Sequence, residues 1–183
     1  MDASSLSEAM GGVLSLEAYG RFAPAFNEAM NLAEITTVER SAMWCAQLGH
    51  ESVGLQYMEE IASGEEYEGR ADLGNVYPGD GVRFKGRGPI QVTGRSNYAA
   101  LSKWLFDRGV VPTETFFVDD PEQLASADYG FYGAVWYWAT RGLNDFADAG
   151  DVVGATQVIN GGTNGLADRQ ERYEKCMAMG DRI

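Results

Sequence analysis

The chain has 183 residues, of which 45% are hydrophobic and 22% are charged. That length fits one domain able to bury about two-thirds of the surface of the unfolded chain, and the composition excludes a disordered protein. Fourteen Lys and Arg against 27 Asp and Glu give a net charge of −13. Because such a charge repels phosphate backbones and anionic lipid headgroups, neither nucleic acid nor a membrane is an expected partner.

Several other classes of protein are excluded by particular residues. Met1 to Leu16 lacks a basic segment followed by an apolar run, so it does not resemble a signal peptide. The two cysteines, Cys45 and Cys176, lie among apolar neighbours and are expected to be buried free thiols rather than a disulfide. With one histidine, His50, and no close cysteine pair, we expect neither a zinc site nor any other cofactor.

The first clear helix signal lies in the middle of the N-terminal third. Thr36-Thr37-Val38-Glu39 matches a capping box, and apolar residues follow it at helical spacing. We expect a helix from there to about His50 or Glu51, ending before Gly54. A short acidic helical segment is expected between 64 and 75, and a loop with fixed turns between 77 and 94. Inside that loop, residues 90–93 alternate apolar and polar, as in a short half-buried strand.

The second half of the chain predicts further helices. We expect them at 97–107, at a short segment opened by Pro121, at 128–140, at 151–160 and at 166–179. The segment 128–140 has six aromatic residues on more than one face, which is typical of a buried central helix. The sequence therefore predicts a mainly α fold, with residues 1–183 as a single catalytic domain and at most a small β element.

Many carboxyl groups are available for chemistry, and two stand out by position. Glu51 is expected near the end of its helix, and Glu60 nine residues later in a loop. A pair of carboxyls can cleave a glycosidic bond if one protonates the leaving oxygen and the other activates water. From these residues alone, a solvated acidic face is the preferred interpretation. Nucleotide-binding glycine motifs are absent, and the lone His50 leaves no serine or cysteine triad.

Three stretches together carry a resemblance to a known family. They are Ala46-Gln47-Leu48-Gly49-His50-Glu51-Ser52, then Phe84-Lys85-Gly86-Arg87-Gly88-Pro89-Ile90-Gln91-Val92-Thr93-Gly94-Arg95-Ser96-Asn97-Tyr98, and Ile159-Asn160-Gly161-Gly162 with Ala167-Asp168-Arg169. These stretches resemble the family 19 glycoside hydrolases, which include chitinases and phage and bacterial lysins. The resemblance implies a bilobal, mainly helical, lysozyme-like domain with a small β element beside a central cleft, and an inverting mechanism.

The resemblance also implies a role for particular residues. Glu51 matches the general acid and Glu60 the base of bacterial members, while Thr93 matches a residue that holds the attacking water. Other matched positions line the sugar sites or support the carboxylates; they are His50, Gln91, Asn97, Asn160 and Arg169. Ordinary structural roles remain open for several of them: strand-edge pairing for Gln91 and Thr93, and a helix C-cap for Asn160.

Some positions depart from the plant chitinases. The disulfides of those enzymes are missing, and Asn164 stands where they commonly have Glu. Glu68 competes with Glu60 as the base because plant members take their base from further along the chain, and Glu59 is adjacent. The segment 67–75 looks more like the lysin branch, which favours peptidoglycan over chitin as the substrate.

The sequence thus predicts a monomeric, metal-independent endolysin that hydrolyses bacterial peptidoglycan, without a separate wall-binding domain. Chitinase is the first alternative, and a non-catalytic glycan-binding protein and a lytic transglycosylase remain open. Without a visible signal peptide, the expected location is the host cytoplasm until release to the cell wall, or outside the cell if a leader has been removed.

Overall fold

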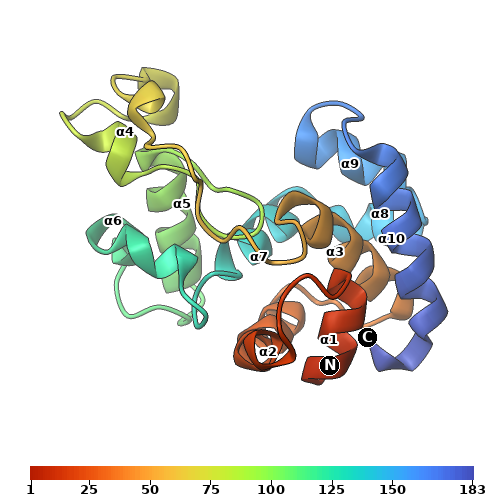
Figure 1. The fold of residues 1–183 in the computed structure, drawn as a ribbon. Helices are drawn as coiled ribbons and strands as arrows, with labels where there is room; N and C mark the ends of the chain where they lie inside the picture. Colours follow the sequence, from red (N-terminus) through yellow and green to blue (C-terminus); the bar gives the residue numbers. More distant parts are fainter. The chain divides into compact units, whose positions relative to one another are not determined.

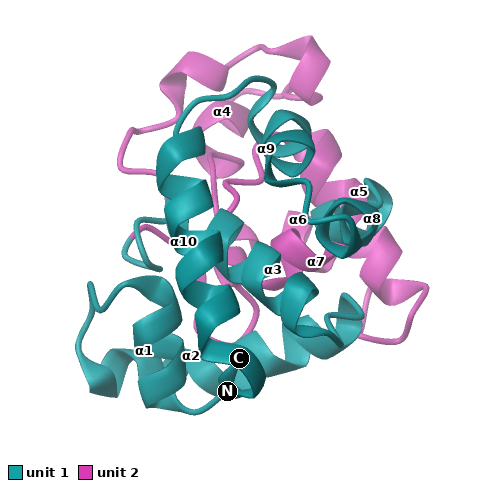
Figure 2. Ribbon diagram, turned by 90° about the vertical axis from the view of Figure 1, so that its right-hand side faces the viewer, with its two compact units in different colours: residues 1–56, 137–183 teal, residues 57–136 magenta.

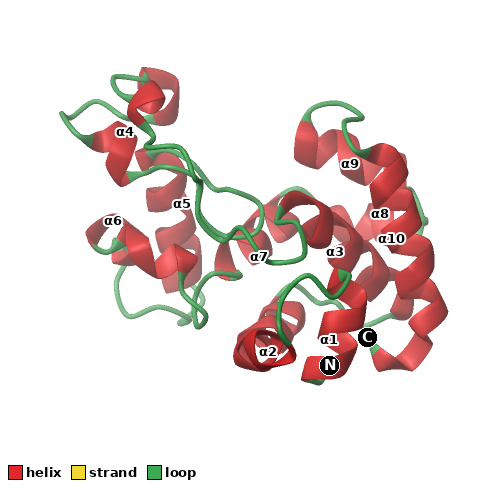
Figure 3. Cartoon of the chain, in the orientation of Figure 1, coloured by secondary structure: helices red, strands yellow, loops and turns green.

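The computed structural model describes residues 1–183 and consists of helices joined by loops (Figures 1 and 3). Its strand-type pairings are two isolated antiparallel bridges, Glu59 with Arg87 and Arg87 with Val92. The expected mainly α fold is confirmed. No helix combines the length and the apolar character that a membrane span needs.

The chain divides into two compact units (Figure 2). Unit 1 contains residues 1–56 and 137–183, and unit 2 contains residues 57–136. Unit 2 is therefore one continuous segment inserted into the chain of unit 1. The chain leaves unit 1 after Gln56 and re-enters it within helix α7 (Tyr132–Thr140).

Unit 1 contains helices near both ends of the chain. They are α1 (Ala3–Met10), α2 (Leu16–Leu32), α3 (Val38–Glu51), α8 (Leu143–Asp148), α9 (Val152–Asn160), α10 (Leu166–Met179) and the 3-10 turn η4 (Gly180–Arg182). The sequence did not lead us to expect α1, α2 or α8. Yet α1 and α2 begin with ordinary caps, because Asp2 and Ser15 each accept a hydrogen bond from a backbone N–H three residues later.

Helix α3 forms the centre of unit 1. Every residue from Ser41 to Gly49 is buried, and α10, α1 and α8 pack against this helix. The Trp44 ring lies 5.1 Å from that of Trp138 and 6.3 Å from that of Phe26, in edge-on arrangements. The predicted free, buried state of both cysteines is confirmed. Because α3 is packed on several sides, the core of unit 1 fixes the position of its last residue, Glu51.

The start of α3 differs by one residue from the predicted capping box. Thr37, not Thr36, is the N-cap, and its hydroxyl accepts a hydrogen bond from the N–H of Arg40 at 3.2 Å. Glu39 therefore does not occupy the third helical position that a capping box requires. The helix nevertheless ends at Glu51, as expected.

Unit 2 has shorter elements and more loop. They are η1 (Glu65–Tyr67), η2 (Ala71–Leu73), α4 (Asp80–Arg83), α5 (Arg95–Phe106), α6 (Phe116–Asp119), η3 (Pro121–Ala125) and the first part of α7. The helical segment expected at 64–75 is two single 3-10 turns instead. A short helix, α4, lies inside the segment 77–94, for which we expected turns and one short strand but no helix.

The strand predicted at residues 90–93 is wrong. Gln91 has a φ of 56°, in the left-handed region that a strand does not use, and its N–H donates to the carbonyl of Gly88 at 3.1 Å. The segment Gly88–Gln91 is therefore a turn, and only Val92 forms a bridge, with Arg87. Four alternating residues were too few to separate a strand from a turn that shows the same alternation.

A buried ion pair holds the loops of unit 2 to α5. The guanidinium of Arg95 donates to both oxygens of Asp80, at 2.8 and 2.5 Å, and the Asp80 side chain is only 2% exposed. The backbone N–H of Tyr77 donates to the same carboxylate at 3.1 Å. The hydrogen bonds from Arg95 hold the pKa of Asp80 below its ordinary value of 3.8.

We expect Asp80→Asn to lower the free energy of unfolding by roughly 3 kcal/mol at pH 7, because it leaves a partly buried guanidinium without its counter-charge. Since the folded-state pKa of Asp80 is depressed, its contribution is present above pH 3.8 and is lost as the pH falls through the folded value. The stability difference between wild type and variant, measured by urea unfolding, should therefore shrink below about pH 4.

Asp107→Asn is the matched control in the same unit. Asp107 pairs with Lys103 at 3.0 Å, but both side chains are at least half exposed, so its removal should cost less than about 1 kcal/mol. An equal loss in the two variants at pH 7 would contradict the structural role given to Asp80.

Candidate functional site

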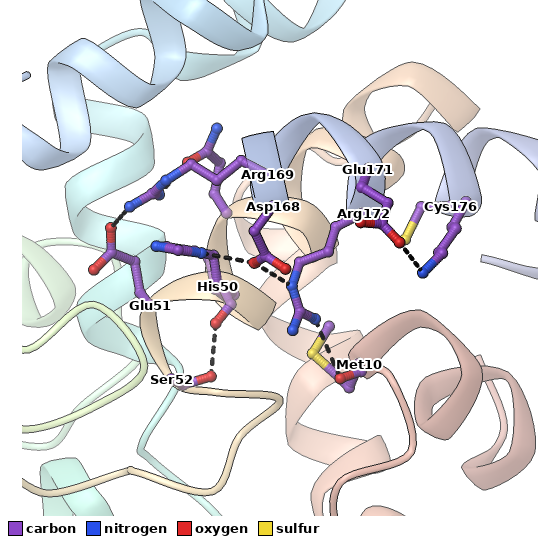
Figure 4. Close-up of polar contacts among 12 residues, drawn as sticks. Met10, His50, Glu51, Ser52, Asp168, Arg169, Glu171, Arg172 and Cys176 are labelled. Carbon is purple, nitrogen blue, oxygen red and sulfur yellow. Dashed lines mark hydrogen bonds and ion pairs between the residues drawn. The ribbon is translucent and has the colours of Figure 1, made fainter. Parts of the chain in front are cut away.

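The carboxyl of Glu51 is positioned by a fully buried arginine. Glu51 is the last residue of α3, and its Oε1 accepts a hydrogen bond from Nη2 of Arg169 in α10 (Figure 4). The Arg169 side chain is 0% exposed, whereas that of Glu51 is 22% exposed. In Figure 4 the second oxygen of Glu51 points away from Arg169. One oxygen is thus fixed inside unit 1, and the positive charge of Arg169 balances the negative end of the α3 dipole.

Gln47 holds the other side of the same guanidinium. It lies one helical turn before Glu51, on the same face of α3, and its Oε1 accepts from Arg169 Nη1 at 2.5 Å. The Gln47 amide in turn donates to the hydroxyl of Thr156 in α9 at 3.2 Å. That hydroxyl donates to the carbonyl of Val152 at 2.7 Å. A continuous chain of buried hydrogen bonds therefore runs from Glu51 to the backbone of α9.

His50 is used to attach α10 to α3. Its Nδ1 lies 2.7 Å from a carboxylate oxygen of Asp168, and Arg172 Nε donates to the same oxygen at 2.8 Å. Burial alone would raise the pKa of Asp168, but the hydrogen bonds from His50 and Arg172 outweigh it and hold that pKa below its ordinary value. The ring also packs against Gly165, where any Cβ would overlap it at 2.1 Å. His50 thus links α3 to α10, while its side chain stays 27% exposed.

The loop after α9 carries Asn160, the last residue of that helix. Asn160 is exposed, and Gly161, in a left-handed conformation, caps the helix. No hydrogen bond joins Asn160 to any other predicted site residue. The loop is tied to the site through Asn164, whose carbonyl accepts from Arg169 Nε at 3.3 Å. Arg169 thus meets a backbone carbonyl on the side of this loop and the amide oxygen of Gln47 on the side of α3.

In unit 2, the carboxylate of Glu60 is held by neutral donors. Its Oε1 accepts from the Tyr67 hydroxyl at 2.9 Å, and its Oε2 from the N–H of Gly86 at 3.0 Å. Burial and the nearby Glu60 charge raise the pKa of Tyr67 well above its usual value, so the hydroxyl stays protonated and keeps donating. Lys85 donates to the backbone carbonyl of Glu60 rather than to its carboxylate.

The loop of residues 88–97 contains the other predicted residues of unit 2. Gln91 donates to the Gly88 carbonyl at 2.8 Å, and its Oε1 lies beside Gly86, which also contacts Glu60. The Thr93 hydroxyl donates to the Gln91 carbonyl at 2.9 Å, and the Asn97 amide donates to the Thr93 carbonyl at 2.7 Å. All three side chains are half-buried, so the polar groups that shape this loop also remain partly accessible.

The two competitors of Glu60 are engaged differently. Glu59 lies 3.3 Å from Lys85 Nζ and 3.1 Å from Arg87 Nη2. Glu68 accepts hydrogen bonds from the backbone N–H groups of Gly79 and Gly81, at 2.6 and 2.8 Å, and so fixes the start of α4. Both Glu59 and Glu68 therefore have structural roles. The assignment of Glu60 as the base stays a prediction.

The structure groups the predicted residues by unit. Glu51, His50, Asn160 and Arg169 belong to unit 1, whereas Glu60, Gln91, Thr93 and Asn97 belong to unit 2. Gln47, Thr156 and Tyr67 also support the two carboxyls, although the sequence assigned them no role. The position of Gln47, four residues before Glu51 on one helix, was the available signal. No group of three or more His, Cys, Asp or Glu side chains is arranged to hold a metal ion.

The chain was compared with proteins of known family. No family model matches it. A "Glycosyl hydrolase family 19 domain-containing protein" of Haemophilus influenzae is 32% identical over 170 residues, covering 75% of this chain and 78% of that protein. An endochitinase of Arabidopsis thaliana is 37% identical over 124 residues, covering 66% of this chain and 38% of that protein. The match therefore spans well under half the length of the plant relative.

Solved structures share the fold. Chitinase C from Streptomyces griseus has a TM-score of 0.72 at 18% identity, over 97% of this chain and 75% of that chain. A class IV chitinase from Zea mays has a TM-score of 0.60 at 21% identity, over 96% of this chain and 87% of that chain. At these identities the likeness establishes the fold alone, and the family follows from the Haemophilus relative. The chain belongs to glycosyl hydrolase family 19 and is a glycoside hydrolase.

Proposed function

We propose that this protein hydrolyses glycosidic bonds in bacterial peptidoglycan, as a monomer and with inversion of configuration. Glu51 acts as the general acid and Glu60 as the general base. The observation that carries the proposal is the fixed carboxyl of Glu51, held through one oxygen by a buried arginine while the side chain remains partly accessible. The family relationship supports the reaction class, and the lysin-like segment 67–75 supports peptidoglycan.

The acid step follows from the way Glu51 is held. Because Arg169 occupies Oε1, the proton for the leaving group resides on the other oxygen, which points away from the guanidinium. Transfer of that proton to the glycosidic oxygen breaks the bond to the anomeric carbon and leaves a carboxylate. Arg169 then balances the charge that appears on Glu51, without moving.

The base step follows from the donors around Glu60. Tyr67 and the Gly86 amide each donate to one oxygen and hold the carboxylate in a single orientation. In an inverting reaction this carboxylate accepts a proton from a water molecule as the water attacks the anomeric carbon. Thr93, on the nearby loop, is proposed to orient that water. Gln91, Asn97, Asn160 and His50 are proposed to contact the sugars.

Chitin is the second candidate substrate. It is favoured by the named relatives, since the Arabidopsis protein is an endochitinase and the matched folds are chitinases. Both polymers contain N-acetylglucosamine, and amide and hydroxyl side chains suit either one. A direct comparison of the two polymers decides between them.

The first test measures cleavage of purified peptidoglycan and of chitin, with mass analysis of the fragments. We expect peptidoglycan fragments that have gained one water at each cut, which also separates hydrolysis from transglycosylation to anhydro ends. Glu51→Gln should lower the rate at least about 100-fold, because it removes the acid proton. Glu171→Gln, at an exposed position of α10, is the matched control. Release of chitooligosaccharides with no action on peptidoglycan would reverse the choice of substrate.

A second test assigns the base. Glu60→Gln should lower the catalytic rate by about 100-fold or more, whereas Glu59→Gln and Glu68→Gln should change it by less than about tenfold. Glu59 and Glu68 support Arg87 and α4, so their variants should lose thermal stability instead. Melting temperature and kcat are measured for all three. If Glu68→Gln stays folded and loses the most activity, the base is Glu68.

A third test concerns Gln47, which we propose to be a positioning residue for Arg169. Gln47→Leu removes the acceptor for one guanidinium nitrogen, so kcat should fall about tenfold while KM changes little. Thr156→Val breaks only the next link and should have a smaller effect. Asn144→Leu removes comparable hydrogen bonds in α8 and should reduce stability alone. Equal losses of kcat in Gln47→Leu and Asn144→Leu would show that Gln47 is merely structural.

A further inference from the structure

A cavity of about 760 Å³ lies within unit 2 and has no part in the proposed mechanism. It lies between α4 and the segment 118–122, and four of its lining residues are cations: Arg83, Lys85, Arg87 and Arg95. The chain has only fourteen Lys and Arg and a net charge of −13. So local a concentration of positive groups in an acidic protein marks this cavity as a candidate for anion binding.

Three of the four cations of the cavity are paired with carboxylates. Arg95 is paired with Asp80, while Lys85 and Arg87 share the single carboxylate of Glu59 at 3.3 and 3.1 Å. The lining also contains the carboxyl groups of Asp119, which accepts from the Thr115 hydroxyl, and Glu122. Of the four cations, Arg83 alone has no carboxylate within ion-pair distance. Glu122 lies further from Arg87, at 3.8 Å, and is 71% exposed. The Arg87 side chain lines the cavity and is only 3% exposed, so its guanidinium is held in place.

Arg83 is the cation best placed to take an external anion. It is exposed, and its Nη2 donates to the backbone carbonyls of Val118 and Asp119 at 2.9 and 2.8 Å. No carboxylate pairs with it, so its charge is uncompensated. These two hydrogen bonds hold the side chain at the cavity wall, so little side-chain entropy is lost when a ligand binds.

The rim of the cavity offers an apolar surface beside this charge. Tyr77 is 61% exposed and Val82 is 47% exposed, and both line the cavity. The Arg95 guanidinium lies over one face of the Tyr77 ring, 5.0 Å from its centroid. An exposed tyrosine ring with a valine beside it suits the apolar face of a sugar ring.

The cavity is distinct from the surroundings of Glu60. Gly86 contacts Glu60 and Gln91, whereas the side chains on either side of it, Lys85 and Arg87, line the cavity. A ligand in the cavity therefore does not need to touch the Glu60 carboxylate.

We propose that this cavity is a second binding site for the wall polysaccharide, one that takes a carboxylate-bearing sugar with the acid on Arg83 and the ring on Tyr77. The inference rests on the proposed function, since a muramic sugar of peptidoglycan has a free lactyl carboxylate wherever its stem peptide is absent, while chitin has no carboxylate. The site adds affinity for an acidic glycan and takes no part in bond cleavage.

The test is calorimetric titration of the full chain carrying Glu51→Gln, so that the ligand stays intact. The probes are peptidoglycan glycan strands freed of their stem peptides, which carry lactyl carboxylates, and chitooligosaccharides of equal length. Adding Arg83→Gln should weaken binding of the acidic strands about tenfold and leave chitooligosaccharide binding unchanged. The difference should shrink in high salt. Adding Arg21→Gln instead, at a 69% exposed arginine of unit 1, should change neither affinity.

A second variant guards against a loss of fold, because Arg83 also supports the α6 carbonyls. Tyr77→Ala leaves the backbone N–H on Asp80 in place and should weaken binding of both probes to similar extents. For Arg83→Gln, either of two results overturns the proposal: unchanged affinity for the acidic strands, or an equal loss of affinity for both probes. Failure of the proposed function is seen separately, as absence of peptidoglycan cleavage by the wild type.

Discussion

A single buried positive charge organises unit 1. Burying a guanidinium away from solvent is very unfavourable unless its N–H groups have hydrogen-bond partners. Arg169 meets that requirement with Glu51, Gln47 and the carbonyl of Asn164, which come from α3 and from the loop before α10. Arg169 therefore ties the acidic side chain and the loop to α10, which the pairing of His50 with Asp168 also attaches to α3. If one of these partners moves, Arg169 shifts and its hydrogen bonds to the other partners change as well.

The two carboxyls proposed for catalysis are held by different chemistry. Glu51 is bound by a charged group that is itself buried, whereas Glu60 is bound by a phenol and a peptide N–H, with the nearby ammonium of Lys85 directed to a backbone carbonyl. Neutral donors fix an orientation without neutralising the charge. The carboxyls also belong to separate units of the chain, so each environment is built by its own local packing.

Regular helices could be predicted from sequence, and several local details could not. The apolar spacing located 166–179 to the residue, and α3 ended where expected because helical periodicity extends over several turns. The turn at Gln91 was missed because its positive φ leaves no mark on the pattern of apolar and polar residues. The role of Gln47 was missed because its partner, Arg169, is 122 residues away in the sequence. The family resemblance, by contrast, already implied that Arg169 supports the catalytic carboxylates.

The insertion of one unit into the other has a consequence for biosynthesis. Residues 57–136 form a continuous stretch whose contacts can be made as soon as that stretch has left the ribosome, whereas unit 1 has to wait for residues 137–183. Glu51 and Arg169 are separated by 118 residues, so the acid has no arginine until α10 has been synthesised. A chain cut off before α10 therefore contains all of residues 57–136 but lacks the group that positions its acid.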